Sequence, residues 1–292
     1  MTEAALAMSA ELADELARNG RRKVIDPRTV PLRFHHLKAT GQSPAHGYQS
    51  FQDDRWDTLA LRLGKGTHAM LFGQPIAIWD QPAAKGSGRA PRNGKAWDAF
   101  RSANSHATVL NRNEHDKASR IVTSIRSHEL ASELLFAPGV LHESTINWTQ
   151  DGRARRSTPD ARGTTHFVEL KTTRCAQPDR FRRDGMYRAY HAQLADQANA
   201  IEASTGNRPW SAYIVAVETV EPYVVQVMQL TQRALEQGDQ LCRDWFSRVR
   251  TCEESGQWPG YQAGVCEFDI PDERIDLRFD DDTADIESED ES

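Results

Sequence analysis

The sequence predicts a mixed α/β fold in which a long helix is followed by three antiparallel strands, a second long helix and a buried strand. Three observations predict this order. Apolar residues recur at helical spacing over residues 116–136 and again over residues 184–203. Short alternating segments lie between these two stretches, and turn dipeptides separate them. A run rich in Tyr, Ile and Val then occupies residues 212–217, which is typical of a fully buried strand.

The N-terminal part of the chain is predicted to be helical. Residues 1–30 begin with an alanine-rich pattern mixed with acidic residues, and we expect a helical extension there. Further on, Gly64 and Gly66 precede Thr67, which is a suitable N-cap. A helix is therefore predicted to start at this point, with His68 in its first turn.

The first long helix follows an exposed loop. Residues 81–93 are rich in Pro, Gly and Ser and show no apolar periodicity, which predicts the loop. The helix over residues 116–136 carries four apolar residues at near-helical spacing: Ile121, Ile125, Leu130 and Leu134. Pro138-Gly139 predicts its end.

Three antiparallel strands are predicted next, over residues 144–150, 154–161 and 166–172. Asp151-Gly152 is a hairpin turn between the first two strands, and Arg162-Gly163 turns the chain into the third. After the second long helix, the strand at 212–217 pairs with residues 223–228 across Glu221-Pro222, and residues 235–249 form a closing helix.

Charge is distributed unevenly along the 292 residues, of which 38% are hydrophobic. Residues 267–292 carry 13 acids and two arginines, so we expect an acidic, disordered tail. The other 266 residues carry a net charge of +5, which leaves the body mildly basic. No apolar run approaches the roughly 18 residues of a membrane span, so the sequence predicts a cytoplasmic protein without a membrane partner.

Cysteine spacing argues against a metal cluster built on thiolates. The four cysteines are Cys175, Cys242, Cys252 and Cys266, and none of them forms a Cys-x-x-Cys pair. Such spacing disfavours a zinc ribbon and leaves an iron–sulfur site only weakly open. We expect reduced thiols.

The residues with the most chemical information lie at the end of the second strand and inside the third. Asp160 ends one strand, and Glu169 and Lys171 share one face of the next, so a hairpin can bring the two acids together. Two carboxylates, with the carbonyl of Leu170, suit Mg²⁺ or Mn²⁺, and an adjacent ammonium can position an attacking water. The alternative is that these residues are ordinary exposed charges on a hairpin.

The order of elements, with Pro159-Asp160 and Glu169-Leu170-Lys171 in place, resembles the PD-(D/E)xK nuclease superfamily. Within it, the chain resembles the RecE (exodeoxyribonuclease VIII) and lambda exonuclease type of phage recombination nuclease. The segments that carry this narrower resemblance are His35-His36-Leu37 with Ser43-Pro44-Ala45-His46, Leu63 to His68, Glu143-Ser144 ahead of Asn147-Trp148, and Tyr190-His191-Ala192-Gln193. The resemblance implies an exonuclease domain over residues 31–266.

The resemblance also implies roles for residues outside the strands. His68 would join Asp160, Glu169 and the Leu170 carbonyl at the metal, and Glu143 would assist. Lys171 would position the water, and Gln193 would orient it or a phosphate. Tyr190 would contact DNA or pack in the core, and a capping His68 or a solvated Glu143 remain the plain alternatives. Gln193 and Gln197 lie with Tyr190 along one helical face, where buried polar residues are unusual unless they meet a ligand.

Arginines flank the candidate site on both sides. Arg153 and Arg155 precede Asp160, and many others follow Lys171. Because a polyanion must approach a carboxylate cluster, this excess positive charge favours a phosphodiester substrate. Arg155, Arg174 and Arg182 are the predicted DNA contacts. Trp97 and Phe100 are expected to pack rather than to stack on bases.

By resemblance, the chain degrades linear double-stranded DNA from the ends, 5′ to 3′, and leaves a strand for a single-strand annealing partner in recombination. A single domain of this size cannot encircle a duplex about 20 Å wide, so a cyclic homo-oligomer is expected. The alternatives are an endonuclease or helicase-associated nuclease of the same fold, or a catalytically silent DNA-binding module. The complete set of Asp160, Glu169 and Lys171 argues against the silent module.

Overall fold

The computed structural model describes residues 24–52, 58–80, 91–209, 211–261 and 264–266. Most of the predicted N-terminal extension, the centre of the predicted loop at 81–93 and the acidic tail lie outside the described residues. The chain divides into two units after Gly260, and all named helices and strands belong to the first. The described residues of the second unit form no helix or strand.

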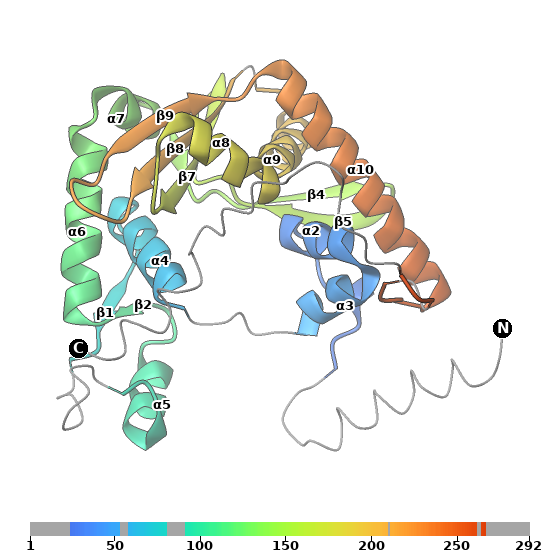
Figure 1. Ribbon diagram of the computed structural model, residues 1–292, viewed down its shortest axis with the longest axis horizontal. Helices are drawn as coiled ribbons and strands as arrows, with labels where there is room; N and C mark the ends of the chain where they lie inside the picture. Colours follow the sequence, from blue (N-terminus) through green and yellow to red (C-terminus); the bar gives the residue numbers. More distant parts are fainter. Residues whose placement is uncertain (1–23, 53–57, 81–90, 210, 262–263, 267–292) are drawn as a thin grey trace. The chain divides into compact units, whose positions relative to one another are not determined.

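A five-stranded mixed sheet forms the centre of the first unit (Figure 1). Its strand order is β3-β6-β7-β8-β9, where β7 and β8 are parallel and every other neighbouring pair is antiparallel. The strands are β3 (Leu141–His142), β6 (Ala161–Arg162), β7 (His166–Thr173), β8 (Ser211–Glu218) and β9 (Val225–Gln229). This sheet, with helices before and between its strands, is the mixed α/β core that the sequence predicts.

Two of the predicted core strands form a separate hairpin instead. β4 (Ile146–Gln150) pairs with β5 (Arg153–Ser157) around Asp151 and Gly152, whose φ angles of 46° and 76° suit the predicted tight turn. The antiparallel strands beside β7 are the two-residue β6 and β3. The prediction of one continuous meander was therefore wrong, because the hairpin is inserted between the first two core strands.

Helices cover both faces of the sheet, and the alternation of β7 separates the two layers. Val168 and Leu170 pack in one cluster with residues of α4 (Leu59–Leu71), α6 (Arg112–Ser127) and α7 (Glu129–Phe136). Phe167 packs on the opposite face with residues of α8 (Pro178–Tyr187), α9 (Tyr190–Thr205) and α10 (Gln232–Ser255). Glu169 and Lys171 share the side of Phe167, so they point towards the layer that contains α9.

Each predicted long helix is broken once. The first splits into α6 and α7 at His128, whose extended backbone ends one helix and whose side chain accepts a hydrogen bond from Ala131 N. The second splits into α8 and α9 at Ala189, which has φ 56°. Apolar spacing continues through both breaks, so the periodicity alone could not reveal them.

The predicted start of the helix carrying His68 was also wrong. Thr58 caps α4 by accepting a hydrogen bond from Leu61 N, and His68 lies in the last turn. Gly66 is inside the helix, where a Cβ would lie 2.7 Å from a methyl of Leu110. The glycine therefore permits close packing against β2 (Thr108–Leu110) and does not mark a helix boundary.

Smaller elements complete the unit. Near the N-terminus, α2 and α3 pack on α10, and Leu32 bridges to Arg155 of β5. The elements are a 3₁₀ helix (Pro27–Thr29), α2 (Phe34–Gln42), α3 (Pro44–Gln52), the parallel pair β1 (Ile76–Ile78) and β2 (Thr108–Leu110), and α5 (Gly94–Ala103). Across the described ranges, none of the helices combines the length and apolarity needed to cross a bilayer.

The contact between α9 and α10 depends on Gly238. A Cβ at this position would lie 2.3 Å from the His191 carbonyl oxygen and 2.8 Å from the Ala192 Cα. We expect Gly238→Ala to lower the free energy of unfolding by about 1–3 kcal/mol, since backbone on both sides must shift. Urea unfolding measures this loss. Gly260→Ala, where a Cβ meets nothing within 4 Å, is the control, and equal stability of the two variants would contradict the packing assignment.

Candidate active site

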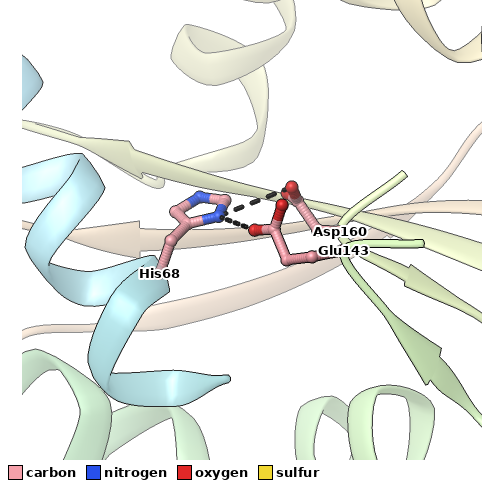
Figure 2. Close-up of side chains that lie close together, drawn as sticks. All are labelled: His68, Glu143 and Asp160. Carbon is pink, nitrogen blue, oxygen red and sulfur yellow. Dashed lines mark hydrogen bonds and ion pairs between the residues drawn. The ribbon is translucent and has the colours of Figure 1, made fainter. Parts of the chain in front are cut away.

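Three side chains from distant parts of the chain meet at the edge of the sheet where β3 ends and β6 begins. His68 comes from the last turn of α4, Glu143 follows β3, and Asp160 precedes β6 (Figure 2). The short β3–β6 ladder fixes the two acids next to each other, because Glu143 N donates to the Asp160 carbonyl oxygen at 3.0 Å. Glu143 has φ 48°, a left-handed conformation that is uncommon outside glycine.

Their ligand atoms form a compact group. His68 Nδ1 lies 3.2 Å from Glu143 Oε1 and 3.4 Å from Asp160 Oδ1. One donor atom from each residue can be chosen so that all three lie within 4.8 Å of one another. Asp160 is only 6% exposed, and its Oδ2 accepts a hydrogen bond from Leu170 N at 2.6 Å. This bond attaches the acid to β7.

The protonation of this group reflects an excess of negative charge. Burial alone lowers the pKa of His68, but Asp160, Glu143 and Glu169 outweigh it and raise the pKa to about 9. Burial, followed by the Glu169 carboxylate, raises the pKa of Asp160 to about 7 against the opposing effect of His68 and Lys171. Without a cation, the site therefore retains protons at neutral pH.

The backbone of Leu170 faces the same edge. Thr219 N donates to Thr173 O, and Gly163 N donates to His166 O, so odd-numbered residues of β7 bond towards β8 and even-numbered residues towards β6. Leu170 is even-numbered, and its N–H already reaches Asp160. The N–H and C=O groups of one strand residue point to the same side. The Leu170 carbonyl therefore points to the edge that holds Asp160.

A second polar cluster surrounds Glu169, which is 5% exposed. Its Oε1 accepts hydrogen bonds from Lys171 Nζ and Gln193 Nε2, both at 2.6 Å. Its Oε2 accepts one from Gln197 Nε2 at 2.7 Å. Glu169 lies outside the group of three ligand atoms but close enough for its charge to act on His68 and Asp160. A direct bond from Glu169 to a metal stays a prediction, and Oε2, which accepts only one hydrogen bond, has a lone pair left for it.

Lys171 remains a hydrogen-bond donor. The Glu169 and Asp160 carboxylates outweigh burial and raise the pKa of its ammonium. Besides Glu169, it donates to Gln193 Oε1 at 3.0 Å, and it lies 4.9 Å from the centre of the Tyr190 ring. Tyr190 also contacts Phe181, with ring centroids 5.8 Å apart. The structure thus places Tyr190 under the lysine, with part of the ring in the core.

The prediction that Arg155 contacts DNA was wrong. Arg155 is 2% exposed and forms a buried ion pair with Asp196 of α9. Its neighbour in the predicted arginine cluster, Arg153, is also buried and donates to Glu253 at 2.9 Å. Both side chains point inward from β5, and each guanidinium is paired with a carboxylate there. Removing either carboxylate would leave an uncompensated buried charge. They connect the hairpin to α9 and α10.

The other predicted DNA contacts are at the surface. Arg174 follows β7 and is exposed, and Arg182 is exposed on α8, where it pairs with Asp179. Trp97 is buried against Trp79, with ring centroids 5.3 Å apart, and Phe100 contacts Trp79 at 4.9 Å. Packing is therefore the role that the structure gives these two aromatics, as expected.

The donor set fits a divalent cation. Two carboxylates and a backbone carbonyl are the hard oxygen ligands that Mg²⁺ and Mn²⁺ prefer, and one imidazole nitrogen completes the group. Burial and then the charge of Glu169 raise the pKa of Asp160, and the charges of Asp160, Glu143 and Glu169 raise the pKa of His68, so neighbouring carboxylates contribute to both shifts. Without a cation, protons on His68 and Asp160 offset the negative charge of the carboxylates. A divalent cation bound there would offset that charge instead.

Two further residues lie near the site, and the sequence gives a weak signal for one of them and none for the other. Gln197 bonds Glu169 directly, and its spacing of four residues from Gln193 was the one available signal. Lys38 of α2 is close enough to Lys171 for their charges to interact. Nothing in the sequence around Lys38 indicated this, because the contact depends on how α2 packs on the junction of α8 and α9.

Comparisons with known proteins agree with this architecture. A family model described as "PDDEXK-like domain of unknown function (DUF3799)" matches residues 34–270. A protein from Eubacterium rectale described as a "putative exonuclease" shares the fold, with TM-score 0.58 and 12% identity over 86% of this chain and 93% of that chain. The alkaline exonuclease LHK-Exo from Laribacter hongkongensis matches at TM-score 0.28 and 14% identity over 68% of this chain and 93% of that chain, a likeness too low to support an argument. Curated proteins give no match. Because the family model spans most of the sequence, the chain belongs to the family of PDDEXK-like domains.

Proposed function

We propose that this protein is a divalent-metal-dependent nuclease that hydrolyses phosphodiester bonds of linear double-stranded DNA from its ends. The observation that carries the proposal is the meeting of His68, Glu143 and Asp160 beside the Lys171–Glu169 pair. One cluster offers ligands for a cation, and the adjacent one offers a fixed ammonium. Metal-assisted hydrolysis of a phosphodiester requires both kinds of group.

Each residue has a specific task in this mechanism. His68, Glu143, Asp160 and the Leu170 carbonyl would hold the metal, with Glu169 as the neighbouring acid. Bound there, a divalent cation supplies charge stabilisation at phosphoryl oxygens and lowers the pKa of a water. The chain's own residues do the positioning.

Lys171 orients the attacking water. Two of its three N–H groups are directed to Glu169 and Gln193, which leaves the third for a water or a phosphate oxygen. Because its pKa is raised, Lys171 donates a hydrogen bond and does not act as the base. Gln193 holds the Lys171 ammonium and the Glu169 carboxylate in place, because it accepts a hydrogen bond from the first and donates one to the second.

Two observations support action from DNA ends. The Eubacterium rectale protein of the same fold is described as a putative exonuclease, and the sequence resembles the RecE and lambda exonuclease type. On this proposal the enzyme acts 5′ to 3′ in phage-type recombination and passes a single strand to an annealing protein. A cyclic homo-oligomer with heterologous interfaces would retain the DNA during successive cuts. The rival is an endonuclease of the same fold.

Digestion of labelled DNA tests the proposal. We expect the purified protein with Mg²⁺ or Mn²⁺ to shorten a linear duplex labelled internally and to leave a covalently closed circle intact. Labels at the 5′ and 3′ ends of separate strands give the polarity, and sedimentation gives the assembly. EDTA should stop the reaction, since the ligands then lack their cation.

Two outcomes would contradict the proposal. Equal cutting of circles and linear DNA by a monomer would indicate the endonuclease. Absence of cleavage with either metal, together with DNA binding, would indicate the silent module.

A further inference from the structure

The junction between α8 and α9 is held in a strained conformation close to the candidate active site. Ala189, which is 7% exposed, has φ 56° and ψ 40° and forms the N-terminal boundary of α9. A left-handed non-glycine residue costs roughly 1–2 kcal/mol. Such strain persists where the surrounding structure fixes it, often at functional sites. Here Ala189 packs in one core cluster with Leu37 of α2 and with Ala192.

The break presents two large apolar side chains to solvent. Met186 is 71% exposed and Tyr187 is 92% exposed, at the end of α8. Tyr187 precedes Tyr190 by three positions, and the ring of Tyr190 lies under Lys171. The Cα atoms of the two tyrosines are therefore at most about 11 Å apart. The exposed pair is therefore only a few residues along the chain from the contact between Tyr190 and Lys171.

Two cations near the junction of α8 and α9 form no ion pair with a carboxylate among the described residues. Arg188 follows Tyr187 directly, and Lys38 on α2 follows Leu37, which packs on the junction. Partial loss of hydration, then the charges of Arg188 and Lys171, lower the pKa of Lys38, which places the three cations near one another. Among the described residues, only Lys171 of the three has an ion pair with an acid. An anionic ligand would offset this surplus.

The pairing of an exposed aromatic with unpaired cations fits single-stranded nucleic acid. Phosphates bind cations, and an aromatic ring stacks on a base only when the base has left its own stack. We propose that Lys38, Met186, Tyr187 and Arg188, here called the junction surface, bind an unpaired nucleotide of the strand being cut. Its base lies on Met186 and Tyr187, and its phosphate lies on Lys38 and Arg188. This inference rests on the proposed function and identifies the state of the substrate at the site.

Binding without cleavage tests the junction surface directly. Fluorescence anisotropy in EDTA measures the affinity of the full chain for oligothymidylate, for the same strand with abasic nucleotides, and for a blunt duplex. We expect Tyr187→Ala to weaken binding of oligothymidylate by about 5- to 100-fold and Tyr187→Phe to restore it. The abasic strand and the duplex should bind Tyr187→Ala and wild type alike.

Salt dependence tests the cations. For single strands, the plot of log K against log salt has a negative slope, and each lost phosphate contact reduces the magnitude of that slope by about 0.7. We expect Lys38→Gln and Arg188→Gln each to reduce the magnitude of the slope by this amount. Arg233→Gln removes the same charge from an exposed position on α10 and should leave the slope unchanged.

The outcomes separate this inference from the proposed function. If wild type cuts DNA but Tyr187→Ala binds every oligonucleotide like wild type, the junction surface is refuted and the nuclease stands. Equal slopes for Lys38→Gln, Arg188→Gln and Arg233→Gln refute the phosphate contacts. If the binding changes appear but wild type cuts nothing, the nuclease fails and the junction surface stands. If Tyr187→Ala sediments differently from wild type but binds the oligonucleotides with the same affinity, the junction surface is an interface between copies of the chain, and the inference is overturned.

Discussion

Asparagine in place of Asp160 is expected to abolish DNA cleavage while the protein stays folded. The amide oxygen can still accept the hydrogen bond from Leu170 N, so the connection between Asp160 and β7 survives. The negative charge that would face a cation is lost, and we expect the rate to fall by at least about 100-fold. Stability should stay level or rise, because burial and Glu169 already disfavour the ionised form of Asp160.

End-labelled DNA and thermal unfolding measure the two effects. Asp179→Asn is the matched control, since it makes the same change at an exposed acid on α8. We expect this control to cleave within about twofold of wild type, because surface ion pairs contribute little. Undiminished metal-dependent cleavage by Asp160→Asn would refute the site.

Loss of Glu169 is expected to affect the fold more than loss of the Asp160 charge. Glu169 accepts hydrogen bonds from Lys171, Gln193 and Gln197, so Glu169→Ala would remove the acceptor of one buried donor, Gln197, and of two half-buried donors, Lys171 and Gln193. Each unsatisfied donor costs about 1–3 kcal/mol. Glu169→Gln retains an acceptor oxygen and is the better variant for activity measurements.

The second large effect is stabilisation by divalent metal. A cation that binds only the folded protein raises the free energy of unfolding by about 2.7 kcal/mol at a concentration of 100 times its Kd. Mn²⁺ or Mg²⁺ should therefore raise the melting temperature of wild type. The shift should shrink sharply in Asp160→Asn, and an equal shift in both proteins would place the cation elsewhere.

This stabilisation should increase with pH. The pKa of His68 is raised from 6.5 to about 9, so its contribution in the metal-free protein is complete below pH 6.5 and is lost as pH rises through 9. The pKa of Asp160 is raised from 3.8 to about 7, so its contribution is lost as pH rises through 7. Metal must displace these protons. Metal affinity from isothermal titration should therefore rise between pH 6.5 and 9, with protons released to the buffer, and a flat profile would contradict the assignment.

Local patterns were sufficient for the parts of the fold that depend on neighbouring residues. The Asp151-Gly152 turn and the strand at β8 follow from turn chemistry and β-branched content, and both are present. Asp160 and Glu169 were expected to be close because one short turn joins their strands. Alternation on β7 likewise places Glu169 and Lys171 on one side of the sheet.

Long-range packing decided the rest. Arg155 looked like a surface cation because its partner Asp196 is 41 residues away and only the folded chain brings them together. Gly64 and Gly66 looked like a helix start, yet Gly66 lies inside α4, where it permits the close approach of Leu110. This shift of the helix start puts His68 in the last turn of α4, from where it reaches Glu143 and Asp160.

The sequence by itself determined the α/β class, the hairpin around Asp151-Gly152, and the placement of Glu169 and Lys171 on one side of β7, since these depend on spacing within a few residues. Only the tertiary structure decided which charges are buried, how His68 meets two acids from other elements, and that Lys38 lies near Lys171. The physical reason is that a charge is stable in a protein interior only beside an opposite charge or hydrogen-bond partner. Those partners come from segments whose distance along the chain carries no local signal.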